Sequence, residues 1–444
     1  MHNEINMVEH DEDNTEIDGD DGVLNAIPVA INALIHAVKD TEEAASLYIP
    51  VAIKIHNKRA LKANQKFEEG SSLLDTEEKQ SQALGMKYLL DAGRTFDRLE
   101  NSRVPDIIEK SLFLNLFSDF DSFIGELVSC IFFKKPELFN SLGRQISVAD
   151  ILSFNDFDEL KEKVLSDEIE CLRRKSYVDQ FTDIGKTFRV ELKKFDRWSQ
   201  FVELTQRRNL LMHCNGIVSE QYMTICKQEG YKFDSEIVVG SKLKIGKEYF
   251  ISSINLILEV AVKLGHTLWR KVFPDELEEA DDHLADVIYD FLHEEDWNKA
   301  ICFGEYSNNL QNVSSDLRRK INIINLVIAY KMSGDNNKAC EVLSSIDWSA
   351  SLDDFKIAQA VLLDDFDGAK EFMIKIGKKG TLIKESAYHN FPLFKEFRSS
   401  EQFKSGYEEV FGYSFLSELK RKAEEKSDEE NSEILSEQEI IAPA

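Results

Sequence analysis

The chain has 444 residues, 43% of them hydrophobic, which is longer than one hydrophobic core usually serves, so we expect two or three folded units. Its 20 glycines and seven prolines are few for this length, and their scarcity favours long uninterrupted helices. No apolar run approaches the roughly 20 residues that a membrane span needs, and the acidic N-terminus is unlike a secretory signal. We therefore expect a soluble, cytoplasmic protein without a membrane partner.

The formal net charge of -27 is unevenly distributed. Residues 1–22 carry nine Asp/Glu and no Lys or Arg, and residues 424–444 carry eight Asp/Glu against one Lys. We expect both ends, residues 1–22 and 417–444, to be solvated and disordered. Residues 172–215 instead carry ten Lys/Arg against five Asp/Glu, which makes a local basic window suited to a phosphate-bearing partner such as RNA.

Several common kinds of site are disfavoured. The six cysteines are scattered, without a CxxC pair or a His/Cys cluster, so we expect no disulfide framework, metal or cofactor. The chain also lacks a Walker loop, a GxSxG elbow, an HExxH pair and a dinucleotide fingerprint, which disfavours a classical hydrolase or kinase.

The first folded part is expected to be helical. Apolar residues recur at helical spacing after residue 23, and we assign residues 23–106 to an N-terminal helical segment. A second unit spans residues 107–274. It opens with the strongly apolar run 111–133, SLFLNLFSDFDSFIGELVSCIFF, which predicts a central buried helix whose phenylalanines belong to the core.

The rest of this unit is expected to contain one small element of sheet. A helix from about Asp196 to Cys214 should stop at Asn215-Gly216, because both residue types tolerate the left-handed backbone that ends helices. Alternating β-branched residues around two glycines predict a β-hairpin near residues 236–249. Another helix should follow and end at Pro274.

Residues 275–416 are expected to form helix pairs. A short polar turn followed by a helix with an early alanine occurs three times, and Ala300, Ala339 and Ala369 mark the three places. Their spacings bracket the tetratricopeptide period of about 34 residues, although a generic array of α-hairpins also fits. Either arrangement predicts a surface that binds a protein or peptide.

The run RNLLMH, from Arg208 to His213, lies at the end of a predicted helix and inside the basic window. An Arg–His pair at such a spacing is expected about once by chance in a chain this long, so the surroundings carry the weight. Asn209 directly follows the arginine, apolar residues fill the interval, and the Asn215-Gly216 stop comes after the histidine. This pattern resembles the HEPN superfamily, particularly its bacterial defence-associated members, over roughly residues 107–273.

The resemblance implies a mostly α protein: a HEPN-type helical bundle with a small β-hairpin insertion, followed by the α-hairpin repeats. It also implies a metal-independent endoribonuclease, usually a homodimer whose motif helices face each other across one active site. Arg208, Asn209 and His213 match the catalytic positions. The expected role is that of an RNA-cleaving toxin or an antiviral effector of the abortive-infection type, with the repeats sensing or regulating.

Four further basic residues are candidates for RNA binding. Arg207 lies six residues before His213, and Arg173, Arg174 and Lys175 lie in the same basic window. Arginine's planar fork suits phosphate oxygens.

The residue types support the catalytic roles independently of the family. Histidine titrates near neutral pH and suits transfer of the 2′-hydroxyl proton, while arginine suits the charge that develops on phosphorus. Asn209 and His213 share a helix face, but Arg208 lies five residues from His213, about 140° around the helix. The backbone of one straight helix therefore does not bring the arginine and the histidine together. The long arginine side chain or the helix of a second protomer must complete the site, which is a reason to expect a dimer.

Two other interpretations stay open. Arg208 can pair with an acid such as Glu203 while His213 only closes the helix end, and the motif is then structural. The whole chain can instead be a non-catalytic adaptor or RNA-binding protein that dimerises through the HEPN-like part and binds a partner through its repeats.

Overall fold

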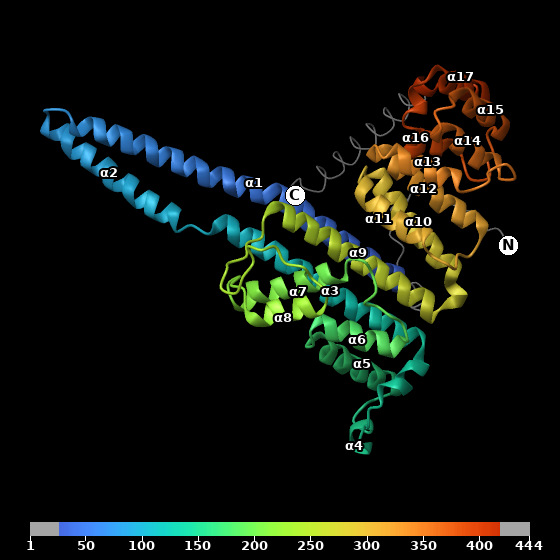
Figure 1. Cartoon of the computed structure of the whole chain (residues 1–444), viewed down its shortest axis with the longest axis horizontal. Helices are drawn as coiled ribbons and strands as arrows, with labels where there is room; N and C mark the ends of the chain where they lie inside the picture. The colour runs from blue at the N-terminus through green and yellow to red at the C-terminus, as the bar shows by residue number, and fades with distance from the viewer. Residues whose placement is uncertain (1–25, 418–444) are drawn as a thin grey trace, which may run out of the picture. The chain divides into compact units, whose positions relative to one another are not determined.

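The computed structural model describes residues 26–417, and within this range the chain divides into two compact units, residues 26–274 and 275–417. The described elements are helices, and the only β pairing among them is an isolated antiparallel bridge between Ile217 and Lys242 (Figure 1). The mostly α fold class is thus confirmed. The predicted acidic ends, residues 1–22 and 417–444, lie outside the described residues except for Ser417.

The N-terminal unit is built around three long helices. Its elements in chain order are α1 (Ala26–Leu74), α2 (Lys79–Glu100), α3 (Val104–Lys134), η1 (Pro136–Leu142), α4 (Val148–Ile151), α5 (Phe157–Arg173), α6 (Tyr177–Phe188), α7 (Trp198–His213), α8 (Glu220–Gln228) and α9 (Lys247–Val272). The first part of α1 packs on α3 and α9, so residues 26–106 belong to the same unit as the segment that follows. The boundary expected at residue 106 falls inside the first turn of α3.

The helix α3 is the centre of this unit, as the apolar run 111–133 predicts. Phe113, Phe117, Phe120 and Phe123 are all buried, so their assignment to the core is confirmed. Because these residues lie three or four positions apart, they form one side of the helix. The rings of Phe120 and Phe201 meet edge to face with centroids 5.7 Å apart, which joins α3 to α7.

The helix α9 is also largely buried and packs on α1 and α3. By length and composition alone it is the one helix in residues 26–417 that is apolar enough to cross a membrane, but 72% of its most apolar window is buried inside the protein. Its small residue Gly265 lets Ile31 of α1 approach closely, since an added Cβ would lie 2.7 Å from the Ile31 Cδ1.

The predicted β-hairpin near residues 236–249 is wrong. The Val218 N–H donates to the Ser241 carbonyl and the Gly240 N–H to the Val218 carbonyl, both at 2.9 Å, so this segment pairs with the chain after α7. Val238 and Val239 are both exposed, which a strand with one buried face does not allow, and residues from Lys247 onward already belong to α9. The alternation of β-branched residues belongs to an extended loop whose Ile237 packs on Tyr222 and its neighbours.

The distal part of α1 pairs with α2, and the two form a hairpin that projects from the rest of the unit (Figure 1). The helices approach closely because Gly70 and Gly85 face each other: a Cβ on either would lie within 2.9 Å of the other's carbonyl oxygen. We call residues 46–100 the arm.

The C-terminal unit consists of short helices in pairs. Its elements in chain order are η2 (Pro274–Glu276), α10 (Leu277–His293), α11 (Trp297–Asn308), α12 (Asp316–Ser333), α13 (Asn336–Ser344), α14 (Asp353–Leu362), α15 (Phe366–Ile376), α16 (Glu385–Asn390), η3 (Pro392–Phe394), η4 (Phe397–Ser399) and α17 (Glu401–Phe411).

Three of its turns have the same construction. Asp296, Asp335 and Asp365 each accept a backbone N–H three residues ahead and so cap α11, α13 and α15. The residue before each aspartate has a positive φ, and the alanine four residues after it is buried against the preceding helix. The repeated polar turns of the sequence are therefore three α-hairpins with one turn geometry.

The buried histidine of α10 makes this unit sensitive to acid. Burial lowers the pKa of His283 from 6.5 to about 4. The unfolded chain binds a proton at this residue below pH 6.5, but the folded chain does so only below about pH 4. The free energy of unfolding should therefore fall by up to roughly 3 kcal/mol as the pH decreases through this interval.

Urea unfolding at pH 7 and pH 5 tests this expectation. Between these two pH values the free energy of unfolding should decrease much less in the variant His283→Gln than in the wild-type protein. An equal decrease in both proteins would contradict it.

Candidate functional site

The motif helix α7 ends where the sequence predicts. His213 is its last residue, and Asn215 and Gly216 follow with φ of 50° and 79°, so both have the left-handed backbone that stops a helix. The Gly216 N–H donates to the Leu210 carbonyl at 2.9 Å, and the Asn215 side chain accepts from Arg103 at 3.3 Å. The last turn of α7 is thus held beside the junction of α2 and α3.

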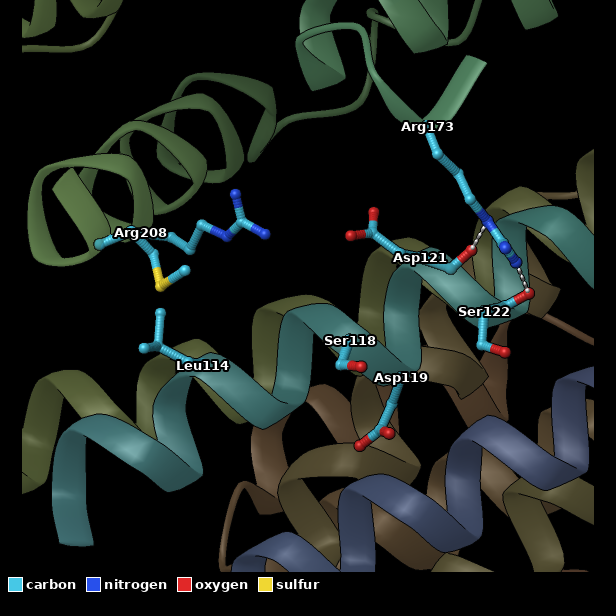
Figure 2. Close-up of a pocket in the computed structure, with 8 residues that line it drawn as sticks. Leu114, Ser118, Asp119, Asp121, Ser122, Arg173 and Arg208 are labelled. Carbon is cyan, nitrogen blue, oxygen red and sulfur yellow. Dashed lines mark hydrogen bonds between the residues drawn. The ribbon is translucent and has the colours of Figure 1, made fainter. Parts of the chain in front are cut away.

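Arg208 opens into a polar pocket of about 520 Å³ between α7, α3 and the end of α5 (Figure 2). The residues that line it are Leu114, Ser118, Asp119, Asp121, Ser122, Arg173, Arg208 and Met212. In Figure 2 the Arg208 guanidinium points toward the Asp121 carboxylate. Its Nη1 donates to the Asn209 side chain at 3.2 Å, while its buried Nε has no hydrogen-bond partner among residues 26–417. Because the bond to Asn209 uses only one N–H of the two Nη atoms, the exposed end of the Arg208 guanidinium keeps donor capacity for a ligand.

Two aspartates of α3 line the pocket, and of the two only Asp121 points toward Arg208 (Figure 2). Asp121 is mostly buried, and burial raises its pKa, although the Tyr177 hydroxyl, which donates to it at 2.6 Å, and the Arg208 charge oppose the rise. Burial also raises the pKa of Asp119, which accepts from Asn115 at 2.8 Å. The site predicted from the sequence includes neither Asp119 nor Asp121. The only sequence feature that points to them is the polar run SDFDS, residues 118–122, which interrupts an otherwise apolar helix.

Of the three basic neighbours at residues 173–175, only Arg173 reaches the pocket. It lies across α3 and donates to the carbonyls of Asp121 at 3.0 Å and Ser122 at 3.4 Å. Gly125 makes this approach possible, because a Cβ there would lie 2.2 Å from the Arg173 Nη2. Arg174 instead pairs with Glu170, and Lys175 pairs with Asp183 at 2.8 Å.

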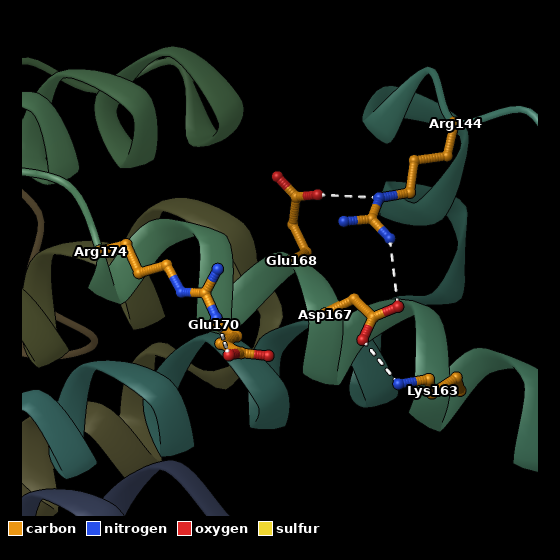
Figure 3. A network of polar contacts seen from close by, with 6 residues as sticks. All are labelled: Arg144, Lys163, Asp167, Glu168, Glu170 and Arg174. Atoms are coloured by element: carbon orange, nitrogen blue, oxygen red, sulfur yellow. Dashed lines mark hydrogen bonds and ion pairs between the residues drawn. The ribbon is translucent and has the colours of Figure 1, made fainter.

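Ion pairs neutralise much of the surface around α5. Arg144 bridges Asp167 and Glu168 at 3.6 and 3.1 Å, and Lys163 pairs with Asp167 at 2.8 Å (Figure 3). The hydrogen bond from Lys163 lowers the pKa of Asp167 and so favours its charged form. The basic window 172–215 is similar, since six of its ten cations form ion pairs: Arg174, Lys175, Lys186, Lys194, Arg197 and Arg207. The positive sequence charge of this window is largely balanced in the fold.

Arg207 lies in the core, away from Arg208. Its Nε is 2.7 Å from the Glu203 carboxylate, and its guanidinium stacks on the Tyr249 ring with Cζ 3.8 Å from the centroid. The hydroxyls of Tyr222 and Tyr249 donate to the same carboxylate at 2.6 and 2.8 Å. Burial raises the pKa of both tyrosines well above the usual range, so they remain protonated donors. The sequence left open an ion pair between Arg208 and Glu203. In the structure Glu203 pairs with Arg207 instead.

His213 is exposed at the end of α7 and does not line the pocket. Asn209 shares a helix face with it by spacing, but the Asn209 amide oxygen accepts from Arg208. One chain therefore brings Arg208, Asn209 and Arg173 to one place and leaves His213 apart from them. Among residues 26–417 no group of three or more His, Cys, Asp or Glu side chains is arranged to hold a metal ion.

Comparison of the chain with family models, with curated proteins and with solved structures finds no match.

The different surroundings of the two adjacent arginines predict different effects on stability. Arg207→Ala leaves the Glu203 carboxylate buried without its counter-charge and should lower the free energy of unfolding by about 3 kcal/mol or more. Arg208→Ala removes a half-buried side chain without an ion pair and should cost less than about 1 kcal/mol.

Thermal unfolding of both variants checks this. A unit of this size should lose about 10 °C in Tm with Arg207→Ala, and only a few degrees with Arg208→Ala. Equal losses in the two variants would show that Arg208 is also part of the core.

Proposed function

We propose that the protein is a metal-independent endoribonuclease of the HEPN type that acts as a homodimer. The observation that carries the proposal is the position of Arg208, which turns from α7 into a polar pocket with an unpartnered Nε, five residues before an exposed histidine at the end of the same helix. The resemblance of the run from Arg208 to His213 to the HEPN motif supports the same conclusion.

The reaction we propose needs no cofactor. The 2′-oxygen of a ribose attacks the adjacent phosphorus, so the new bond closes a 2′,3′-cyclic phosphate and the bond to the 5′-oxygen of the next nucleotide breaks. The His213 imidazole accepts the 2′-hydroxyl proton, and the departing 5′-oxygen takes a proton from water. Arg208 donates to the non-bridging phosphate oxygens, where negative charge increases in the transition state.

Asn209 and Arg173 act through position and charge in this proposal. The Asn209 amide fixes the Arg208 fork, and Arg173 adds a second positive charge at the pocket. Asp121 holds Arg208 toward the pocket until a phosphate takes its place. Arg207, Arg174 and Lys175 have ion-pair partners within the chain and are given no contact with RNA.

The separation of Arg208 from His213 is the reason for the dimer. His213 does not line the pocket of its own chain, so we propose that the arginine of one protomer and the histidine of the other complete each site. The exposed last turn of α7, with Met212 48% exposed beside the pocket, is where the second protomer would approach.

The C-terminal unit has a separate role in this proposal, as the sensing or regulating part of a toxin or antiviral effector. It contains a pocket of about 440 Å³ whose lining includes Val327, Lys331, Cys340 and Leu363. A mixed apolar and polar pocket between helix pairs suits a peptide segment. The same observation favours the alternative of a non-catalytic adaptor, in which this pocket holds the partner and α7 only dimerises.

Loss of either motif residue should abolish RNA cleavage. We expect His213→Ala and Arg208→Ala to reduce cleavage at least about 100-fold, because each removes one chemical role from the transition state. Purified protein is incubated in EDTA with total cellular RNA, and the RNA ends are sequenced. Wild-type cleavage should leave 2′,3′-cyclic phosphate ends, whereas an adaptor would leave the RNA intact in all three samples.

The shared site makes a second expectation possible. A refolded equimolar mixture of Arg208→Ala and His213→Ala chains should recover about a quarter of the wild-type rate, because half of the dimers are mixed and each mixed dimer has one intact site. A mixture as inactive as its two components, at a concentration where dimers form, would place the arginine and the histidine of each site on one chain.

A further inference from the structure

The arm exposes far more of its helices than it buries. Beyond residue 45 the buried residues of α1 are only Ala63 and Gly70, and those of α2 are only Gly85 and Ala92. The seam between the two helices is therefore narrow, and both outer faces are open to solvent (Figure 1).

The α1 side of the arm is basic over residues 44–67, although the protein as a whole is strongly acidic and residues 68–100 of the arm carry eight Asp/Glu. Residues 44–67 contain no Asp or Glu. The five cations of this segment are all exposed: Lys54, Lys58, Arg59, Lys62 and Lys66. The four lysines are four residues apart, so they follow one side of α1 at intervals of about 6 Å, comparable with the separation of successive phosphates in an extended strand. On α2, Lys87, Arg94 and Arg98 point away from the Gly85–Ala92 seam by the same helical geometry.

These cations are available to a ligand. Within residues 26–417 only Lys66 among the cations of the arm forms an ion pair, with Asp91 at 3.8 Å. This differs from the basic window 172–215, where most cations are neutralised by neighbouring carboxylates. Residues 44–67 thus present a row of cations of which only Lys66 is ion-paired.

Apolar side chains lie on the same face, nearer the body of the unit. Leu47, Tyr48, Val51 and Ile55 are 53%, 61%, 52% and 47% exposed. Unpaired bases and riboses offer flat apolar surfaces to such side chains, while a duplex hides its bases within the stack. The combination of unpaired lysines and exposed apolar groups fits single-stranded RNA better than a duplex.

The arm begins beside the candidate site. The hydrogen bond from Arg103 to Asn215 joins the end of α2 to the residue two positions after His213. A strand held along the arm would therefore reach the exposed histidine. A second copy of the arm is a poorer occupant of this face, because two rows of unpaired lysines would repel each other.

We infer that the basic outer face of the arm binds single-stranded RNA and leads it to His213. This inference rests on the proposed function, since it gives the arm to the same substrate. The structure assigns binding to Lys54, Lys58 and Lys62, with Tyr48 and Val51 contacting bases and sugars.

The test measures binding apart from cleavage. In the binding titration every protein carries His213→Ala, and the probe is a fluorescently labelled 20-nucleotide oligouridylate followed by fluorescence anisotropy. Cleavage is measured separately, with the wild-type chain and with the arm variant in a chain that keeps His213. The triple variant Lys54→Gln/Lys58→Gln/Lys62→Gln should raise Kd by roughly tenfold or more and reduce the slope of log K against log salt by about 2, because three phosphate contacts are lost. The matched control Lys163→Gln/Lys186→Gln/Lys194→Gln removes the same charge from ion-paired lysines and should change Kd less than about twofold.

Other results decide between the explanations. Unchanged binding by the arm variant, or an equal loss in the matched control, overturns the inference. Equal affinity for a duplex of the same length overturns the assignment to single strands. A change from dimer to monomer in sedimentation velocity, with RNA affinity unaltered, assigns the face to a second copy instead. If the arm binds RNA but the wild-type protein does not cleave it, the inference about the arm stands and the proposed ribonuclease activity is refuted. If the arm variant cleaves RNA as fast as the wild-type protein, only the inference about the arm is refuted.

Discussion

The Glu203 carboxylate is the constraint on which the site depends. It accepts from the Tyr222 hydroxyl of α8, the Tyr249 hydroxyl of α9 and the Arg207 guanidinium one turn along its own helix. The buried Glu203 carboxylate thus has a buried counter-charge and two hydroxyl donors. Loss of any one of these partners would leave part of the charge uncompensated and lower the free energy of unfolding. This network fixes the rotation of α7 against two other helices. Because Arg208 is the next residue, about 100° further around the helix, the same rotation aims it at α3 and the pocket.

The two adjacent arginines show how much of this was predictable. Helix ends, the core phenylalanines and the stop at Asn215-Gly216 depend on local patterns, and the structure confirms them. The choice of Arg207 rather than Arg208 as the partner of Glu203 depends on where α8 and α9 place their tyrosines, which sequence spacing does not contain. The β-hairpin failed for a related reason: the alternating residues near Val238 are typical of a strand, but their hydrogen-bond partner lies at Val218.

The residues that line the pocket also could not be predicted from local sequence patterns. Asp119 and Asp121 belong to a helix identified by its apolar residues. That both line the pocket follows only from the packing of α3 beside Arg208 and Arg173, and Tyr177 contacts Asp121 alone. Similarly, Arg173, Arg174 and Lys175 are equivalent in sequence, yet Gly125 admits only the first to the pocket while Glu170 and Asp183 hold the others. Ion pairing is a property of the folded surface, so a count of charges along the chain overestimates what is free to bind.

The same distinction changes the meaning of the net charge. A chain of -27 would repel RNA if its charge were uniform, and a basic window that is neutralised internally would not overcome this. On the arm, residues 44–67 form a stretch without Asp or Glu, and the exposed cations of this stretch other than Lys66 have no ion pair. At an ionic strength where the screening length is about 8 Å, charges much further away than this contribute little, so the local field of the arm governs what binds there. A strongly acidic protein can thus present a site for a polyanion, provided that the cations stand apart and stay unpaired.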